Sequence, residues 1–317
     1  DIFTTQQVKD QNLKMGNKIF FSKILLFGEY GVIKNSKALV IPYKKYFGSL
    51  KFSKTADDYQ KTSNTNLKVF SDYLKDNKFI YNKINITKFK YDIDNGLYFE
   101  SSIPESYGLG SSAAVVAAVY YSYKDQNKEE LEINNLKSIL SRMESFFHGN
   151  SSGIDPLSCY IQKPVLVESK INVKLIDVPD QNLNSNRALF LVDTNSQGNT
   201  QTLVKTFFEK LDDINFQSFF ENDFVSVIND TIINFLECNY QEFEKNFIDL
   251  SKKTFANFQE MVPDNFKKLW IDGIENEEYY LKLCGSGGGG YLIGLTKNLK
   301  KIEKYFPDKK IEILFEF

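Results

Sequence analysis

The spacing of apolar residues along the first half of the chain predicts a mixture of strands and helices. Short apolar or alternating runs bounded by glycine or polar residues are typical of strands. Such runs cover residues 18–32, which break at Gly28, and 37–42 (together strand, turn, strand), then 46–52, 91–102 and 164–177 (two strands). Apolar residues at helical spacing predict helices over residues 67–78, 111–123 and 131–147, and the polar stretch 57–66 predicts a loop.

The second half of the chain is richer in amphipathic helical segments. These occupy residues 201–211, 223–236, 240–261 and 265–274, whereas strand patterns occur at 188–193, 279–284, 291–295 and 311–317. The polar stretch 178–186 predicts a domain boundary. We therefore expect an α+β protein with an N-terminal domain over residues 18–180 and a C-terminal domain over residues 181–317. Residues 1–17 are expected to be a polar leader, disordered or not native, with Met15 as a candidate natural start.

One stretch, PESYGLGSSAAVVAA at residues 104–118, combines glycines, serines and a run of small apolar residues. Gly108 and Gly110 favour a tight loop, and Ser111 and Ser112 stand where the N-cap of the following helix is expected. The free N–H groups and the positive dipole end of that helix would form an anion site, most naturally for phosphate. The loop lacks the Walker pattern, because no Lys-Ser or Lys-Thr pair follows its second glycine.

Composition limits the partners that this chain can recruit. Its 317 residues suffice for two modest domains, and its net charge of −2 gives no global field for nucleic acid or an anionic membrane. Arg142 and Arg187 are the only arginines, so a phosphate site must depend on backbone amides, lysine and metal. The three cysteines are far apart in the sequence, without disulfide or metal-ligand spacing, which indicates a reducing compartment and a cytoplasmic protein.

Three side chains could supply the parts of a phosphoryl-transfer site. Ser112 and Glu144 offer the hard oxygen ligands that Mg²⁺ prefers, and Asp155, at the end of the glycine-serine turn HGNSSGID, could act on an acceptor hydroxyl. Each has a plainer interpretation as well. Glu144 alone could be a solvated helix carboxylate, and Asp155 before a proline could be a turn former. The only histidine, His148, is better explained as a helix-end residue than as a base, and Cys284 as packing.

Four ordered motifs resemble those of the GHMP kinases, the superfamily of galactokinase, homoserine kinase, mevalonate kinase and phosphomevalonate kinase. They are KILLFGEYGVI at residues 23–33, the loop at residues 104–114, HGNSSGID at residues 148–155 and KLCGSGGGGYLIGL at residues 282–295. The first and third have the mevalonate kinase form. The resemblance covers residues 18–317 and implies a two-domain GHMP kinase fold. Its N-terminal domain would be a ribosomal-protein-like β-α domain and its C-terminal domain ferredoxin-like.

The resemblance also implies a role for each matching residue. Asp155 corresponds to the catalytic aspartate, Lys23 to the lysine that orients it and the transferred phosphate, and Ser112 and Glu144 to the Mg²⁺ ligands. The ATP phosphates would lie on the loop, and the C-terminal glycine motif would support that loop. The loop residues are Pro104, Gly108, Leu109, Gly110, Ser111 and Ser112; the supporting residues are Gly285, Ser286 and Gly287; and the substrate residues are Glu29, Tyr30 and Thr200.

Three substitutions depart from the family pattern. Ser22 stands for a glycine, Tyr30 for the histidine of Gly-Glu-His, and Ser286 for an alanine. Tyr30 falls near the expected pocket for the substrate carboxylate, so it affects substrate contacts more than phosphoryl transfer.

The activity implied by the resemblance is ATP- and Mg²⁺-dependent phosphorylation of the 5-hydroxyl of mevalonate, in isoprenoid precursor synthesis. The protein would act as a monomer or homodimer. Phosphomevalonate kinase or another small-alcohol kinase is the alternative within the enzyme class. The alternative outside it is a GHMP-fold sensor or regulator, which would typically lose the aspartate, the lysine or the metal ligands.

Overall fold

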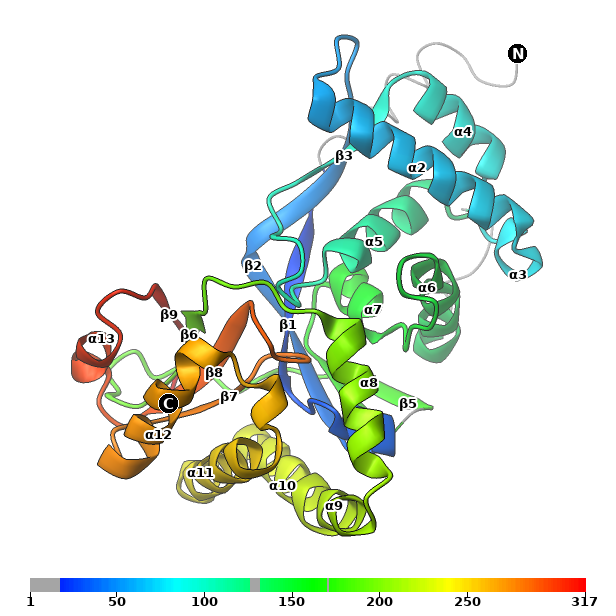
Figure 1. Cartoon of the computed structure of the whole chain (residues 1–317). Coiled ribbons are helices and arrows are strands. Elements are labelled where there is room, and N and C mark those ends of the chain that lie inside the picture. The colour runs from blue at the N-terminus through cyan, green and yellow to red at the C-terminus, as the bar shows by residue number, and fades with distance from the viewer. Residues whose placement is uncertain (1–17, 126–131, 170) are drawn as a thin grey trace. The chain divides into compact units, whose positions relative to one another are not determined.

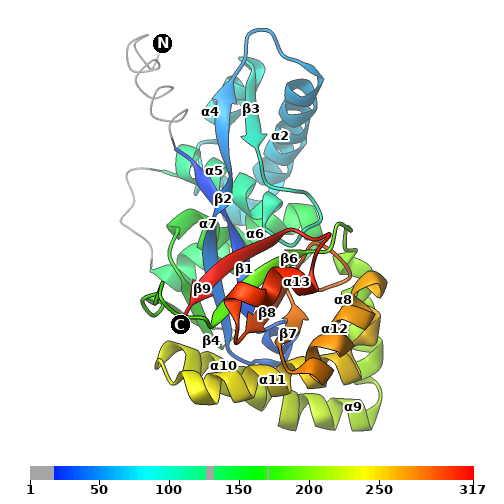
Figure 2. The same ribbon diagram turned by 90° about the vertical axis from the view of Figure 1, so that its left-hand side faces the viewer.

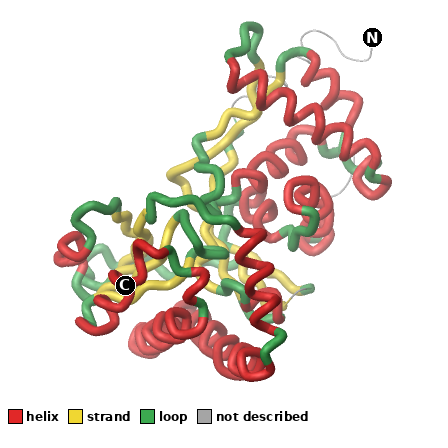
Figure 3. Tube along the Cα trace, in the orientation of Figure 1, coloured by secondary structure: helices red, strands yellow, loops and turns green. Residues whose placement is uncertain are grey.

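The computed structural model describes residues 18–125, 132–169 and 171–317; the expected leader, residues 1–17, lies outside the described residues. Strands and helices mix along the whole chain, which confirms the α+β fold class (Figure 1; Figure 3). The chain forms two compact units. The first comprises residues up to Lys23, Ile41–Pro104 and Leu109–Lys163, and the second comprises Ile24–Val40, Glu105–Gly108 and Pro164–Phe317. The domain boundary expected near residue 180 stays a prediction.

The first unit is a helical layer with a strand pair. Strand β3 (Leu97–Ser101) pairs antiparallel with the second half of β2 (Ala38–Phe52). The first half of β1 (Phe20–Phe27), up to Lys23, also belongs to this unit. The helices of the unit are α2 (Asp58–Asp76), α3 (Lys78–Tyr81), α4 (Ile86–Asp94), α5 (Ser111–Tyr123), α6 (Ile133–His148) and α7 (Ile154–Ile161).

Helix α5 is the central helix of this unit. Its residues from Ala113 to Val119 are small or β-branched, and all of them except Val115 are fully buried. Small side chains let neighbouring backbones approach closely, and α5 packs against α7, α6 and α4 (Figure 1). The predicted helix at residues 111–123 is therefore confirmed, and its apolar composition on all faces is explained by burial rather than by an amphipathic surface position.

The second unit is built on a four-stranded antiparallel sheet in the order β7-β8-β6-β9 (Figure 2). The strands are β6 (Ala188–Asp193), β7 (Tyr279–Leu283), β8 (Tyr291–Thr296) and β9 (Ile311–Glu316). Helices lie between β6 and β7 and again between β8 and β9, which is the β-α-β-β-α-β order of a ferredoxin-like sheet. The smaller strands β4 (Val165–Ser169) and β5 (Asn172–Leu175) pair with each other, and β4 also pairs with residues 38–40.

Five longer helices follow β6 in this unit, together with short turns of helix. They are α8 (Thr200–Leu211), α9 (Ile214–Phe219), α10 (Val225–Leu236), α11 (Tyr240–Asn257) and α12 (Asp264–Asn276), with the π-helical turn η2 (Phe220–Phe224) between α9 and α10. The 3₁₀ turns are η1 (Gly31–Lys34), η3 (Gln259–Met261) and η4 (Leu299–Lys301), and α13 (Ile302–Tyr305) precedes β9. Within the three described ranges, no helix is both long and apolar enough to cross a membrane.

Four elements predicted from the pattern of apolar and polar residues differ in the structure, each for a local reason. Residues 57–66 are not a loop, because Asp57 and Gln60 form a capping box that starts α2 at Asp58. Only residues 97–101 of the predicted strand 91–102 are extended, since Asn85 caps α4 and that helix runs to Asp94. The predicted strands 37–42 and 46–52 are one strand, β2. Pro42 lies between its pairing with β4 and its pairing with β3, so neither ladder needs the missing N–H.

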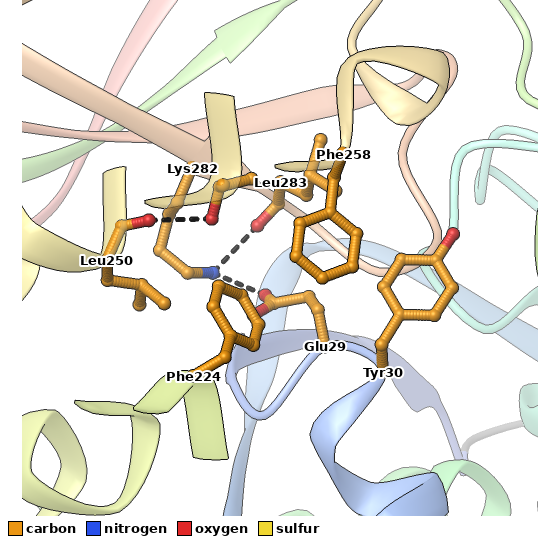
Figure 4. Close-up of a pocket in the computed structure, with 8 residues that line it drawn as sticks. Glu29, Tyr30, Phe224, Leu250, Phe258, Lys282 and Leu283 are labelled. Atoms are coloured by element: carbon orange, nitrogen blue, oxygen red, sulfur yellow. Dashed lines mark hydrogen bonds and ion pairs between the residues drawn. The ribbon is translucent and has the colours of Figure 1, made fainter. Parts of the chain in front are cut away.

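A buried ion pair joins two distant segments of the second unit. Lys282 on β7 is 1% exposed and reaches the carboxylate of Glu29, which follows β1 (Figure 4). The same ammonium donates to the carbonyl oxygens of Leu26, at 2.9 Å, and Leu283, at 2.7 Å. Its three donors are therefore all used. Burial nevertheless raises the pKa of Glu29, because desolvation outweighs the attraction of Lys282.

We expect Lys282→Met to destabilise the protein by about 3–5 kcal/mol, since it leaves the Glu29 carboxylate buried without its partner. The measurement is the free energy of unfolding from urea denaturation. Lys300→Met, at an exposed lysine of η4, is the control and should stay within about 0.5 kcal/mol of wild type. Equal losses in both variants would contradict a stabilising role of the pair.

Candidate active site

The N-terminus of α5 is not capped by a side chain. Its N-cap is Gly110, which has φ of 81° and provides no side-chain cap, so the expected capping by Ser111 or Ser112 is wrong: both are already helical. The first turn also contains no acidic residue. The N–H groups of this turn are therefore available to an anion, as the positive end of the helix dipole favours.

Lys23, on β1, contacts both the loop before α5 and the carboxylate of Asp155. Its backbone N–H donates to Leu109 O at 3.0 Å, which ties β1 to the loop. Its side chain is 5% exposed, and Nζ lies 2.7 Å from Asp155 Oδ2. A Cβ atom at Gly110 would lie 3.1 Å from Lys23 Cγ, so the glycine gives room for the lysine stem. The structure thus brings Lys23, Leu109, Gly110 and Asp155 into one place.

Asp155 is held in the first turn of α7. The turn before this helix ends at Gly153, which has φ of 76° and packs so closely on α6 that a Cβ would lie 2.3 Å from Lys137 O. The Asp155 side chain is 41% exposed, whereas its partner Lys23 is buried. The carboxylate is therefore fixed by a buried cation and still open to a reactant.

Glu144 and Ser112 face each other from α6 and α5. Ser112 Oγ lies 3.4 Å from Glu144 Oε1 and 2.9 Å from His148 Nε2, and Ser151 Oγ donates to Glu144 Oε2. Glu144 is only 5% exposed. Burial raises the pKa of Glu144 to about 7, and the negative charge of Asp155 adds to the effect.

This pair fits a small divalent cation. Two adjacent ligands of an octahedral Mg²⁺ at about 2.1 Å lie about 2.9 Å apart, close to the 3.4 Å between Ser112 Oγ and Glu144 Oε1. In the part of the chain that the structure describes, no three His, Cys, Asp or Glu side chains cluster as a ready-made metal site. Mg²⁺ commonly takes one or two protein oxygens and completes its shell with phosphates and water, which suits this donor set.

The remaining predicted site residues belong to the second unit, except Pro104, which ends a segment of the first. Tyr30 is buried, donates its hydroxyl to Ser286 O at 2.6 Å and packs on the ring of Phe207 (Figure 4 shows Tyr30 beside Phe258). Ser286 Oγ and Thr200 Oγ1 are 3.0 Å apart. Three residues with a predicted site role thus form one cluster, whereas the Glu29 carboxylate is turned to Lys282.

The glycine run at residues 285–290 lies against Tyr107 and Gly108 of the loop at residues 104–112, inside the second unit. A Cβ at Gly290 would lie 2.7 Å from Tyr107 O, and one at Gly108 would lie 3.6 Å from Cys284 O. Gly285 and Gly287, both predicted to support the loop, differ in the space around them. A Cβ at Gly285 would meet nothing within 4 Å, whereas one at Gly287 would lie 2.5 Å from Met261 O. Gly285 therefore leaves open space and Gly287 serves packing.

Sequence reasoning missed Ser151 and Lys282 and set His148 aside. Ser151 and His148 lie in the motif HGNSSGID, and Lys282 opens the glycine-rich motif, so proximity in sequence to the selected residues was the available signal. Their contacts could not be found that way, because each partner is on another segment or turn of the fold.

The chain matches one protein family by sequence and several solved structures by fold. Residues 72–163 match the family described as GHMP kinases N terminal domain. A search of the curated proteins finds no match. Mevalonate kinases recur among the similar structures. Mevalonate kinase of L. major in complex with R-mevalonate is 15% identical, with a TM-score of 0.61 over 91% of this chain and 89% of that one.

Two other kinases are similar to the same degree. Phosphomevalonate kinase of Streptococcus pneumoniae, in complex with phosphomevalonate and AMPPNP, is 14% identical, with a TM-score of 0.62 over 94% and 99% of the two chains. Galactokinase of Lactococcus lactis complexed with galactose is 12% identical, with a TM-score of 0.61 over 98% and 97%. At these identities the structures establish the fold and leave the substrate open.

We expect Gly110→Ala to destabilise the protein by about 1–3 kcal/mol more than Gly108→Ala, because the new Cβ crowds the stem of Lys23. Gly108 is a matched control. It also has positive φ, and its Cβ would make only an ordinary contact. Urea denaturation measures the loss of unfolding free energy in both variants. Equal losses would show that positive φ, and not contact with Lys23, is the reason for a glycine at position 110.

Proposed function

We propose that the chain, whose residues 72–163 match the family described as GHMP kinases N terminal domain, is a GHMP kinase that transfers the γ-phosphate of ATP to the 5-hydroxyl of mevalonate. The observation that supports phosphoryl transfer best is the ion pair of Lys23 and Asp155. It lies in the same unit as the open N-terminus of α5 and the facing oxygens of Ser112 and Glu144.

Each of these groups has a distinct task in the proposed reaction. The N–H groups at the start of α5 bind the phosphates. Asp155 accepts a hydrogen bond from the acceptor hydroxyl, orients its oxygen for in-line attack and takes its proton. Lys23 holds Asp155 in place and offers positive charge to the transferred phosphoryl group. Mg²⁺, held by Ser112 and Glu144, would neutralise charge on the phosphates.

The proposed acceptor is an unphosphorylated branched acid, because the lysines that open the first and fourth motifs already form ion pairs within the protein. Lys23 pairs with Asp155 and Lys282 with Glu29, so neither is spare for a second phosphate on the substrate. Val32 and Ile33, the last two residues of the first motif, would give an apolar wall suited to a methyl-bearing acid rather than to a sugar. We propose that Tyr30 and Thr200 contact the acceptor, and that Glu29 contributes through the turn that carries Tyr30.

Phosphomevalonate kinase is the second candidate, favoured by a fold similarity as high as that to mevalonate kinase. Another small-alcohol kinase would have the same site in the first unit. A sensor without activity is disfavoured, because Lys23, Asp155, Ser112 and Glu144 are all kept and are in contact in pairs.

Asp155→Asn should lower kcat by roughly 10²–10⁴-fold, since it removes the proton acceptor but keeps the size of the side chain. ATP binding should survive, because the phosphates are bound by other groups. A coupled assay of ADP release gives kcat, with Asp94→Asn at the exposed end of α4 as the control. A near-normal kcat in Asp155→Asn would contradict the assignment.

Purified protein should use mevalonate at least about tenfold more efficiently than phosphomevalonate, by kcat/KM. A difference of this size corresponds to about 1.4 kcal/mol of transition-state stabilisation. The same ADP-release assay, run also with homoserine and galactose, measures it. The reverse order would make the protein a phosphomevalonate kinase and would leave the superfamily assignment intact.

A further inference from the structure

Ser151, in the turn between α6 and α7, makes three hydrogen bonds that join the two halves of the site in the first unit. Its hydroxyl donates to Glu144 Oε2 and accepts from the backbone N–H of Gly153 at 2.9 Å. Its carbonyl oxygen accepts from Ser141 Oγ at 2.6 Å. One residue thus contacts the α6 carboxylate on one side and the turn that precedes Asp155 on the other.

The bond to Glu144 fixes the rotation of a buried carboxylate. Ser151 is bonded to Oε2, so Oε1 is the oxygen that faces Ser112 Oγ, 3.4 Å away. A carboxylate that is only 5% exposed has little water to satisfy Oε2 in its place. Without the Ser151 hydroxyl, the Glu144 carboxylate would be free to rotate or to accept a closer hydrogen bond from Ser112. The distance between Glu144 Oε1 and Ser112 Oγ would then change.

The bond from Gly153 fixes the direction in which Ser151 donates. A hydroxyl has a single hydrogen, and the Gly153 N–H occupies an acceptor position on its oxygen. The hydrogen is then free for Glu144. Because Gly153 packs on α6 and Asp155 lies two residues further on, the same bond ties the position of Glu144 to the start of α7.

We propose that Ser151 is a positioning residue for the divalent cation: it orients Glu144 so that Oε1 and Ser112 Oγ bind the metal of the metal–nucleotide complex together. The proposal rests on the proposed function, since it takes Glu144 and Ser112 as the metal ligands. Groups that hydrogen-bond to metal-ligating carboxylates commonly change metal affinity by 10–100-fold when removed.

The test is Mn²⁺ binding to the protein in the presence of saturating ADP, followed by the electron paramagnetic resonance signal of free Mn²⁺. No acceptor substrate is needed. Ser151→Ala should weaken Mn²⁺ binding about tenfold or more. Ser151→Thr keeps the hydroxyl and should stay within about twofold of wild type. Ser151→Cys keeps the size with a weaker donor and should lie between them, and it serves if the alanine variant does not fold.

Ser145→Ala is the matched control. Ser145 directly follows Glu144 on α6 and is half-buried like Ser151, but its hydroxyl bonds to Ser141 O in its own helix. Its removal should leave Mn²⁺ affinity unchanged. Affinity for ADP without metal is measured for all variants and should be the same in each, because Ser151 acts on the metal and not on the nucleotide.

Glu144→Gln separates failure of this proposal from failure of the proposed function. If Glu144→Gln weakens Mn²⁺ binding and Ser151→Ala and Ser151→Cys do not, the role of Ser151 is overturned and the metal assignment stands. Loss of metal-free ADP affinity in Ser151→Ala equal to its loss of Mn²⁺ affinity would also overturn it, as a general structural effect. If Glu144→Gln binds Mn²⁺ like wild type, the metal assignment itself fails.

Discussion

The first unit depends on how one buried lysine is accommodated. The backbone N–H of Lys23 donates to Leu109 O, and the stem of its side chain lies against Gly110, which has no Cβ. Burying an ammonium is costly unless it is paired, so Asp155 must stay within reach, and with it the start of α7. The absence of a Cβ at Gly110 leaves room for the stem of Lys23, and the turn ending at Gly153 places Asp155 at the start of α7.

The two carboxylates near Lys23 differ in burial. Two carboxylates, Asp155 and Glu144, are near this lysine, and Glu144 is the more deeply buried. Lys23 and the hydroxyls of Ser112 and Ser151 stabilise the charged form of Glu144, yet desolvation still raises its pKa. A divalent cation held by Glu144 and Ser112, as proposed above, would favour the charged form of this carboxylate.

The second unit also contains a buried lysine, Lys282, which has different partners from Lys23. Lys282 satisfies Glu29 and two backbone carbonyls in a dry environment, with the ring of Phe27 5.4 Å from its ammonium. Tyr30 lies next to this pair, in a left-handed conformation (φ 56°), and its ring is enclosed by Phe207 and Phe258. Its hydroxyl therefore has a fixed direction toward Ser286, and through Ser286 the cluster reaches Thr200.

The sequence by itself determined the α+β class, the helix at residues 111–123 and the strands at 188–193 and 279–284, because the period of apolar residues is a local signal. The glycine-serine motifs also led to the selection of Lys23, Ser112, Glu144 and Asp155, whose role in a site stays a prediction. Tertiary structure decided the rest. The capping box at Asp57 started a helix in a polar stretch, and pairing of successive parts of β2 with β4 and β3 made one strand where two were predicted. The bonds of Ser151 to Glu144 and of Lys282 to Glu29 join segments that only folding brings together, so no local pattern could have revealed them.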